Sequence, residues 1–529
     1  MELARLIDEL SRPSAYPFAV EHVEVRQTHI SVVFLAGERV FKVKKPVAFG
    51  FLDFTTLAQR RHYCDEEVRL NRRLAPHVYL GVVPVTQSGS GCRFGGDGEP
   101  LDWAVEMIRL PDHATLEQHL HRGELGPEQL VRIAARIADF HRNAESGPAV
   151  SAYGRFEVVA GNARENFAQT QSQVNSTVSA EVFDRLRRYT DHHLDLLKPL
   201  IQSRADRHVP RDTHGDLHLD HVYLLPDAVP PSDVTIIDCI EFTVRFRYAD
   251  PVADMAFLAM DLKDHGRFDL ARDFADAYFQ LAQDDEGRAL LPFYLAYRSI
   301  VRAKVEGFKL AESEIPSDVR IRAMQRARGH WLLALGELSP PNERPAVLLI
   351  GGLPGSGKST LAKHLSEQYG FAVIRSDVVR KDIAGIPTLR RAAADFRTGL
   401  YSTEMTERTY AECRRRMERS LWEGRRVIVD ASFLRESWRR EFLDAAATWG
   451  VPGRFVHCVA DPPTIRQRLQ NRRNDVSDAD WTIYQQAALQ WELPAADTAG
   501  ASFVFKSDAD GEHEFYRLNK WMSDTLDIV

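Results

Sequence analysis

The sequence predicts a protein of two domains: an α+β domain with a small sheet lobe and a larger helical lobe, then an α/β domain with a parallel sheet wound with helices. Extended apolar runs dominate residues from about 22 to 110, and helical spacing dominates from about 113 to 200. A stretch with three prolines and few apolar residues follows at 336–345 and indicates a linker. Beyond it, short apolar runs alternate with helical patterns, which is typical of a wound parallel sheet.

The first domain is expected over residues 1–335, with its small lobe at about 20–110 and its helical lobe at about 113–335. Apolar runs predict strands at 32–35, 40–43 and 101–110. The turn residues Ala-Gly-Glu-Arg between the first two runs predict a hairpin. Helical apolar spacing predicts helices at 61–74 and 127–142, the second with a proline in its first turn.

The second domain is expected over residues 346–529 and contains five short apolar runs that predict strands. These runs lie at 347–350, 371–374, 426–429, 454–459 and 502–505. Because helical patterns separate them, they are expected to form a parallel sheet whose carboxyl ends meet at one edge.

The composition is that of an ordinary globular protein. The chain has 529 residues, 44% of them hydrophobic and 27% charged, and a formal net charge of -7. This balance gives no electrostatic reason to expect tight nucleic-acid binding, although it leaves a local basic patch open. Five scattered cysteines without a C-x-x-C pair argue against a disulfide framework and a structural zinc site. With neither a signal peptide nor a long apolar stretch, the sequence predicts a cytoplasmic protein without a membrane partner.

The most informative motif is G-x-x-x-x-G-K-[ST] at residues 352–359, directly after the run 347–350 and before a helical pattern. Its glycines let backbone N–H groups converge on phosphate oxygens, Lys358 can reach the β and γ phosphates, and the Ser359 hydroxyl can hold Mg2+. The residues expected to bind the nucleotide are Gly352, Gly355, Ser356, Gly357, Lys358, Ser359 and Thr360. A flexible glycine turn is the alternative, but it does not explain the constrained positions and both flanks. The motif therefore predicts a nucleoside triphosphate site with ATP and Mg2+ as cofactors.

Charged residues follow two later strands of this domain. Asp377 and Arg380 stand three residues apart after the run 371–374, and Asp430 follows the run 426–429. Because ligands of open α/β sheets bind at the carboxyl ends of the strands, these side chains are expected to face the phosphate crevice. Capping of the next helix is the alternative for Asp377. Asp430 stands where an acid near Mg2+ and its waters is expected.

The D-x-x-R pattern after such a glycine loop resembles polynucleotide 5'-kinases, zeta-toxin-like kinases and chloramphenicol phosphotransferase-like enzymes. The resemblance implies that Asp377 accepts the proton of the attacking hydroxyl and that Arg380 stabilises phosphate or substrate charge. Arg468 and Arg472 share one face of a predicted helix. They resemble the lid arginines of small P-loop kinases, which close on the transferring phosphate. A solvated basic helix is the alternative for this pair.

The first domain contains a second motif. Residues 213–221 read T-H-G-D-L-H-L-D-H, and a later apolar run ends in Ile237 and Asp238. These segments resemble the H-G-D-x-H-x-x-N and I-D motifs of aminoglycoside phosphotransferases and their protein-kinase-like relatives, and the resemblance extends over roughly residues 20 to 330. It implies a two-lobed protein-kinase-like fold. In it, Asp216 orients or deprotonates the acceptor hydroxyl and Asp238 holds Mg2+ on the nucleotide phosphates.

A strand lysine paired with a helix glutamate grips the α and β phosphates in such folds. Lys42 and Glu67 fit these places best, with Lys44 and Glu66 as alternates. Strand alternation puts Lys42 and Lys44 on the same face, so the sequence does not choose between them. Solvated surface lysines are the structural alternative.

Two features depart from that family. His221 stands where the family places a metal-binding Asn, and imidazole is a poorer Mg2+ ligand than an amide oxygen. The nucleotide-covering loop lacks G-x-G-x-x-G, since residues 26–31 occupy its place. We therefore expect either altered metal chemistry with Asp238 and His221 as ligands or a site that has lost turnover. A zinc site at His214, His218 and His221 is a further alternative, which the kinase-type loop disfavours.

The whole chain resembles bacterial fusions of an aminoglycoside phosphotransferase-like domain with a zeta-toxin or polynucleotide-kinase-like P-loop domain. This implies a phosphotransferase with two kinase-type domains, each moving the γ-phosphoryl group of ATP to a hydroxyl of a small molecule, such as a sugar, an aminoglycoside-like or a nucleoside-like compound. Two alternatives stay open. The second domain could phosphorylate the 5'-hydroxyl of a nucleic acid, with arginines at 414–416, 425–426 and 439–440 supplying a basic channel. The first domain could instead be a nucleotide-binding regulatory pseudokinase.

Overall fold

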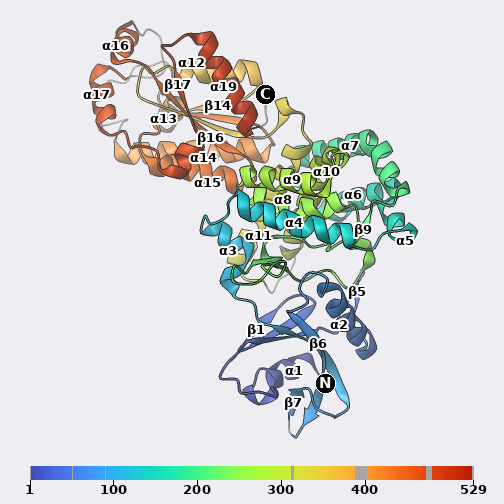
Figure 1. Ribbon diagram of the computed structural model, residues 1–529. Helices are drawn as coiled ribbons and strands as arrows, with labels where there is room; N and C mark the ends of the chain where they lie inside the picture. Colours follow the sequence, from blue (N-terminus) through green and yellow to red (C-terminus); the bar gives the residue numbers. More distant parts are fainter. Residues whose placement is uncertain are drawn as a thin grey trace. The chain divides into compact units, whose positions relative to one another are not determined.

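The computed structural model (Figure 1) describes residues 2–50, 52–89, 91–310, 315–387, 402–471 and 479–526. The chain forms two compact units. The first comprises Met1–Gly161, Leu197–Leu262 and Asp269–Tyr294, and the second comprises Asn162–Leu196, Lys263–Phe268 and Leu295–Val529. The predicted linker at 336–345 lies inside the second unit, and a domain boundary at that linker stays a prediction. Among the described helices, none combines the length and the apolar character that crossing a membrane requires.

The first unit begins with a six-stranded antiparallel sheet, which confirms the predicted sheet lobe. Its strands run in the order β1-β2-β3-β8-β6-β7. Their bounds are β1 (Val23–Gln27), β2 (Ser31–Ala36), β3 (Arg39–Lys44), β6 (Tyr79–Ser88), β7 (Gly91–Phe94) and β8 (Pro100–Ile108). The predicted hairpin is formed by β2 and β3, which pair Ala36 with Arg39 around Gly37. Gly37 has a φ of 61°, a left-handed conformation that glycine adopts without steric cost.

Helix α2 (Leu57–Asn71) packs against β8 and β6. It begins at Leu57, earlier than the predicted start at residue 61, because Thr56 and Gln59 form a capping box that satisfies N–H groups of its first turn. The sequence T-L-A-Q at 56–59 thus sets the start of the helix that carries Glu67.

Strand β3 separates an apolar core from the side of the sheet that carries α2. Phe41 enters this core and stacks on Phe94 with ring centroids 4.3 Å apart. Because successive side chains of a strand point to opposite faces, Lys42 and Lys44 face α2. Both lysines therefore contact Glu67, as their predicted position on one face of the strand allows.

Helices and short strand pairs complete the first unit. Helix α4 (Pro127–Asn143) confirms the predicted helix at 127–142. The short strands are β4 (Ala48–Phe49) with β5 (Leu52–Asp53), β9 (Arg211–Asp212) with β12 (Tyr248–Ala249), and β10 (Val222–Leu224) with β11 (Val234–Ile236). The other helices wholly within this unit are α1 (Leu3–Leu10), α3 (Leu116–His121) and α5 (Pro148–Ser151). Asp216 lies in the loop between β9 and β10, and Asp238 lies directly after β11.

Five helices have residues in both units. They are α6 (Phe156–Thr170), α7 (Ala180–Asp206), α8 (Pro251–Asp264), α9 (Phe268–Ala282) and α10 (Leu291–Lys309). The predicted helical lobe at 113–335 is therefore helical as expected, and its residues are divided between the two units.

The second unit contains a five-stranded parallel sheet, which confirms the predicted wound α/β architecture. The strands run in the order β14-β15-β13-β16-β17. Their bounds are β13 (Val347–Gly351), β14 (Ala372–Arg375), β15 (Val427–Asp430), β16 (Gly453–Val459) and β17 (Ser502–Lys506). Each strand overlaps one of the predicted apolar runs. β13, in the middle, is buried along its whole length, as expected for a central parallel strand.

Helices cover both faces of this sheet (Figure 1). The described helices that lie wholly within this unit are α11 (Ser317–Leu338), α12 (Lys358–Tyr369), α13 (Ser376–Ala384), α14 (Thr403–Trp422), α15 (Glu436–Thr448), α16 (Pro462–Asn471), α17 (Trp481–Leu489), α18 (Ala496–Gly500) and α19 (Gly511–Leu526). Leu348 of β13 enters a core with α12 and α19, whereas Leu349 enters a core with α14 and α15. Trp331 of α11 joins the second core together with Phe167 and Phe183. Helical segments that precede the predicted linker therefore help to build the core under the parallel sheet.

Candidate active sites

The glycine loop at 352–359 joins the buried strand β13 to the start of α12. Gly352 has a φ of +139°, and a Cβ at this position would lie 2.3 Å from the Cys458 carbonyl oxygen, so a side chain is excluded. Lys358 is the first residue of α12, and its Nζ donates to the Leu353 carbonyl at 2.9 Å. A helix N-terminus presents N–H groups that favour anions. The loop therefore has the features of a phosphate cradle.

The carboxyl ends of β15 and β14 bring two charged residues to this loop. Ser359 Oγ donates to Asp430 Oδ2 at 2.6 Å, and Arg375 Nη2 donates to Ser359 Oγ at 3.2 Å. Burial raises the pKa of Asp430, although the charge of Lys358 acts in the opposite direction. A hydroxyl and a carboxylate oxygen in contact are donors that suit Mg2+. The sequence does not predict Arg375 as a site residue. Its position at the end of a predicted strand is the feature that could have indicated it.

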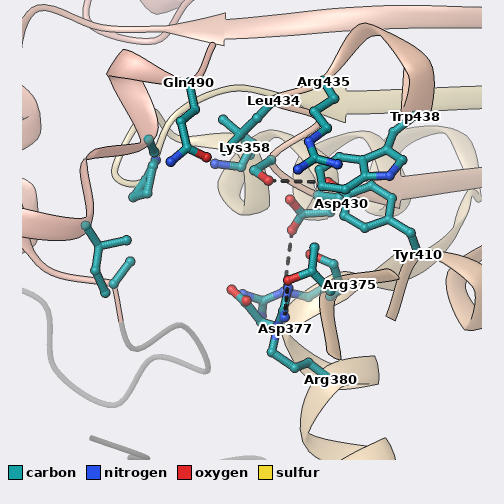
Figure 2. Close-up of a pocket in the computed structure, with 18 of the residues that line it drawn as sticks. Lys358, Arg375, Asp377, Arg380, Tyr410, Asp430, Leu434, Arg435, Trp438 and Gln490 are labelled. Carbon is teal, nitrogen blue, oxygen red and sulfur yellow. Dashed lines mark hydrogen bonds and ion pairs between the residues drawn. The ribbon is translucent and has the colours of Figure 1, made fainter. Parts of the chain in front are cut away.

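A pocket lies at the carboxyl edge of the sheet (Figure 2). Its lining brings together the predicted residues Lys358, Ser359, Asp377, Arg380 and Asp430. Arg380 Nη1 donates to Thr406 Oγ1 at 3.2 Å. The N-cap of α13 is Arg375, without a side-chain capping bond, so helix capping does not account for Asp377.

An aromatic wall lines the same pocket (Figure 2). Tyr410 of α14 and Trp438 of α15 stack with ring centroids 4.1 Å apart and planes inclined by 18°. The Arg435 guanidinium lies 5.0 Å from the centre of the Trp438 ring. Burial raises the pKa of Tyr410 to about 12, and its hydroxyl accepts from the Phe433 N–H at 2.9 Å. The sequence does not single out these residues, because their contact depends on the packing of two helices.

Arg468 of α16 contacts the glycine loop. Its Nη1 donates to the Gly355 carbonyl at 3.4 Å and to Ser507 Oγ at 2.8 Å, and its Nη2 donates to the Ser507 carbonyl at 2.9 Å. Arg472 lies outside the described residues. The lid role of the two arginines stays a prediction.

The first unit holds a buried chain of ion pairs between β3, α2 and the segment after β11. Lys42 Nζ lies 2.9 Å from Glu67 Oε1 and 2.6 Å from Asp238 Oδ1. Lys44 Nζ lies 2.7 Å from Glu67 Oε2 and also pairs with Glu241. Both lysines therefore share Glu67, and Lys42 links it to Asp238 whereas Lys44 links it to Glu241. The sequence does not single out Glu241.

The charges in this chain stabilise one another. Burial alone would lower the pKa of Lys42, but the charges of Asp238 and Glu67 raise that pKa well above its ordinary value. Burial would raise the pKa of Glu67, but Lys42 and Lys44 outweigh it and lower the pKa. These groups are therefore charged at neutral pH. Glu66, the alternate to Glu67, forms an ion pair on the helix surface instead.

Asp254, near the start of α8, braces the loop of the H-G-D motif. Its carboxylate accepts from the N–H of His214 at 3.0 Å and from the N–H of Gly215 at 2.8 Å. His214 Nε2 lies 2.9 Å from the Ile237 carbonyl oxygen, and His214 Nδ1 accepts from the Asp216 N–H at 3.3 Å. Burial lowers the pKa of His214 to about 4. The neutral ring therefore links the two motifs of the first unit at physiological pH.

Four side chains of these motifs meet beside the braced loop. Asp216 Oδ2 lies 3.6 Å from His218 Nε2 and 3.7 Å from His221 Nδ1. His221 Nε2 lies 3.5 Å from Asp238 Oδ2, and the rings of His218 and His221 have centroids 3.9 Å apart. The predicted residues Asp216, His221 and Asp238 are thus brought together with His218. Both nitrogens of His214 serve the loop, so a zinc site of three histidines that includes His214 is wrong.

Comparison with known proteins gives a match to a family model and a relative that spans most of the chain. Residues 347–490 match the model of a family described as "AAA domain". Uncharacterized protein Rv2004c of Mycobacterium tuberculosis (strain ATCC 25618 / H37Rv) is 33% identical over 495 residues, which cover 92% of this chain and 94% of that protein.

Two solved structures show weaker likeness. A sugar kinase from Janibacter sp. HTCC2649 is 18% identical and covers 35% of this chain and 98% of that chain, with a TM-score of 0.27. Amicoumacin kinase hAmiN, in complex with AMP-PNP, Ca2+ and Ami, is 12% identical and covers 60% of this chain and 90% of that chain, with a TM-score of 0.37. At these TM-scores the likeness carries no argument about function.

The antiparallel sheet lobe, the Lys42–Glu67 ion pair and the braced loop are arranged as the resemblance to protein-kinase-like phosphotransferases predicts. The parallel sheet, the phosphate cradle and the match to the AAA domain model give the C-terminal region a P-loop fold. With 33% identity along nearly the whole of both chains, the protein belongs to the family of the mycobacterial protein Rv2004c.

Proposed function

We propose that the protein is an ATP-dependent phosphotransferase whose C-terminal domain transfers the γ-phosphoryl group of ATP to a hydroxyl of a small molecule. The kinase-like folds of both regions suggest phosphotransferase chemistry. The observation that carries the proposal is the convergence, in one pocket, of the phosphate cradle with Asp377 and Arg380. An acid and a cation beside a phosphate cradle support transfer to an acceptor rather than nucleotide binding alone.

Each residue has one task in this proposal. Lys358 holds the β and γ phosphates in the glycine loop, and Asp377 accepts the proton of the attacking hydroxyl. The bond from the hydroxyl oxygen to the γ-phosphorus forms as the bond from that phosphorus to the bridging oxygen of ADP breaks. Arg380 stabilises the charge on the transferring group, and Arg468 and Arg472 close on it as a lid.

The proposed cofactors are ATP and Mg2+. Ser359 Oγ and Asp430 Oδ2, which are in contact at 2.6 Å, are the oxygen donors that would hold Mg2+. When bound, the ion neutralises charge on the phosphate oxygens. The hydroxyl of Ser359 would turn from Asp430 to the ion, so the present hydrogen bond keeps both donors in place for it.

The acceptor is proposed to be a ring-bearing small molecule, such as a sugar, an aminoglycoside-like or a nucleoside-like compound. Tyr410 and Trp438, which stack on each other, and Arg435, which lies over the Trp438 ring, give the pocket an aromatic wall against which such a ring can pack. Thr403, Thr406 and Gln490 add polar groups to the same lining. Pockets with an apolar wall and a few polar groups are typical of small-molecule sites.

Most of the arginines that the nucleic-acid alternative needs for a basic channel are already paired or buried, whereas Arg425 and Arg440 are exposed. The arginines at 414–416 form ion pairs with acidic neighbours on and beside the same helix. Arg426 and Arg439 are buried and donate to backbone carbonyls. Charges that are already paired or buried attract a phosphate backbone weakly. This distribution supports a small-molecule acceptor.

For the N-terminal domain we propose a second kinase-type nucleotide site. Lys42 and Glu67 would position the α and β phosphates, Asp216 would orient an acceptor hydroxyl, and Asp238 and His221 would hold a metal ion. One observation favours the regulatory pseudokinase as a second candidate. Lys42 and Asp238 bind each other at 2.6 Å, so a nucleotide and its metal have to separate them.

The cysteines bear on the compartment. All five, at positions 64, 92, 239, 413 and 458, are buried and form no disulfide. Proteins of reducing compartments keep their thiols in this state. This supports the proposal that the protein works in the cytoplasm.

The test is label transfer from γ-labelled ATP by the full-length protein, offered sugars, aminoglycosides, nucleosides and 5'-hydroxyl oligonucleotides. We expect label on one small-molecule class, and we expect Lys358→Ala to slow this transfer at least ~100-fold. Lys363→Ala is the matched control, because Lys363 is an exposed lysine on the same helix, near Glu367. Label on oligonucleotides alone would favour the nucleic-acid alternative, and undiminished transfer by Lys358→Ala would refute the C-terminal assignment.

A further inference from the structure

We propose that Asp216, His218, His221 and Asp238 bind one divalent transition-metal ion with affinity for imidazole, for which Zn2+ is the best candidate, in place of Mg2+. The inference rests on the proposed N-terminal site. Its test needs neither ATP nor turnover. The metal site can therefore be disproved while the proposed function stands, and the proposed function can be disproved while the metal site stands.

The spacing of the donor atoms is close to that of ligands around one ion. Donors that lie about 2 Å from a tetrahedral ion are about 3.3 Å apart. Asp216 Oδ2 and His218 Nε2 are 3.6 Å apart, and His221 Nε2 and Asp238 Oδ2 are 3.5 Å apart. One donor atom from each of Asp216, His218 and His221 lies within 4.8 Å of the other two. Asp216, His218 and His221 thus form a group of three donors, and Asp238 Oδ2 lies beside this group, 3.5 Å from His221 Nε2.

The hydrogen bond of His221 directs its other nitrogen at an acid. His221 Nδ1 lies 2.9 Å from the Asp216 carbonyl oxygen, and because a carbonyl oxygen only accepts, Nδ1 carries the proton. In the neutral ring, Nε2 then has a lone pair, and it lies 3.5 Å from Asp238 Oδ2. Two acceptors that face each other repel unless a cation lies between them. Metal-binding histidines commonly have this arrangement, with the second nitrogen donating to a backbone carbonyl.

Asp238 is also held in place by its neighbours. Its Oδ1 accepts from Lys42 Nζ at 2.6 Å, which leaves Oδ2 directed toward His221. Its backbone N–H donates to the Tyr79 hydroxyl at 3.2 Å, and its φ of 65° is uncommon for a residue other than glycine. Side chains that other hydrogen bonds orient in this way are typical of metal sites.

The donor set decides which ion fits. Mg2+ prefers oxygen ligands in an octahedron, so two imidazoles are poor ligands for it. Zn2+ and Co2+ accept imidazole readily. The Mg2+ that the family resemblance implies therefore does not fit the N-terminal site, whereas it fits Ser359 and Asp430 of the C-terminal domain. We expect the two sites to hold different metals.

The test uses Co2+ as a spectroscopic probe on the full-length protein after a chelator has removed bound metal. We expect one equivalent of Co2+ to give the intense visible spectrum of a tetrahedral site, and Zn2+ to abolish it by displacement. His221→Asn replaces the imidazole by an amide and should weaken Co2+ binding at least ~10-fold, as should His218→Gln. His192→Asn is the matched control, because His192 is an exposed histidine on α7.

Circular dichroism and thermal unfolding of the metal-free variants check that they fold. A wild-type protein without the tetrahedral Co2+ spectrum would overturn the proposal. Equal Co2+ affinity in the wild type and in His221→Asn would overturn it as well. His221 would then be doubly protonated and would form an ion pair with Asp238 instead of binding a metal. If His221→Asn does not fold, Co2+ binding by His221→Gln decides between the same outcomes.

Discussion

The two candidate sites differ in what holds the lysines that are proposed to bind phosphate. In the N-terminal site, Lys42 lies between two carboxylates, 2.9 Å from Glu67 and 2.6 Å from Asp238. In the C-terminal site, Lys358 Nζ donates to the Leu353 carbonyl at 2.9 Å. A phosphate has to break buried ion pairs at the first site, whereas at the second it competes with a neutral carbonyl. The difference teaches that a lysine can stabilise the fold through buried ion pairs at one site, whereas a lysine at the other site donates to a carbonyl that a ligand can replace.

The largest effect is expected from Asp377→Asn, which tests the C-terminal side of this comparison. The change removes the proposed base but keeps the size of the side chain, so we expect the transfer rate to fall ~100–10,000-fold while the KM for ATP changes little. Steady-state kinetics measure both. Asp382→Asn is the control, since Asp382 lies on the same helix and pairs with Arg416 on the surface. A rate near that of the wild type would remove Asp377 from the mechanism.

The N-terminal side is tested by Glu67→Gln, which leaves two buried lysines without their shared carboxylate. Breaking a buried ion pair in this way is expected to lower the free energy of unfolding by about 3–5 kcal/mol. Glu66→Gln, the matched control on the same helix, breaks a more exposed pair and is expected to cost less than about 1 kcal/mol. Denaturant unfolding measures both. Equal losses would show that the buried chain of ion pairs does not stabilise this unit.

Acidification compares one histidine from each unit, the buried His214 and the half-buried His457. Burial lowers the pKa of His214 and of His457 to about 4, against an ordinary value of 6.5. Because the unfolded chain binds protons first, stability is complete above pH 6.5 and falls as the pH drops toward 4, by up to about 3 kcal/mol for His214. Unfolding measured across this range should show a smaller slope for His214→Asn than for the control His192→Asn. Identical slopes would contradict the assignment of His214 as a buried neutral ring.

The smallest effect is expected at the aromatic wall. Trp438→Ala removes the ring that stacks on Tyr410 and should raise the KM for the acceptor about 3–10-fold, because an aromatic contact contributes about 0.5–1.5 kcal/mol. The KM for ATP should stay unchanged. Trp438→Phe keeps a flat aromatic face and should restore most of the acceptor affinity. An unchanged acceptor KM in Trp438→Ala would place the acceptor elsewhere in the pocket.

The contiguous motifs could be predicted from the sequence because their geometry is local. The loop at 352–359 carries its own glycines, lysine and hydroxyl. Apolar runs predict three strands of the antiparallel sheet (β2, β3 and β8) and the five strands of the parallel sheet, but not β1, β6 and β7. The choice between Lys42 and Lys44 could not be predicted, because it depends on where Asp238 and Glu241 come to lie in space.

Contacts between residues of distant segments could not be predicted either, because they also depend on the tertiary fold. Tyr410 and Trp438 each resemble an ordinary core aromatic within an amphipathic helix, and their stacking follows from the packing of α14 on α15. The arginines at 414–416 form ion pairs on the helix surface, and the sequence contains the signal for this pairing. Glu412 precedes Arg415 and Arg416 by three and four residues, the spacing of a helical ion pair.

The most direct test of the account is one label-transfer assay that compares full-length wild type, Lys358→Ala and Asp216→Ala with the same ATP and the same acceptor. If the C-terminal pocket performs the transfer, Lys358→Ala loses it and Asp216→Ala keeps it. Transfer that persists in Lys358→Ala but disappears in Asp216→Ala would contradict the account and assign the reaction to the N-terminal site.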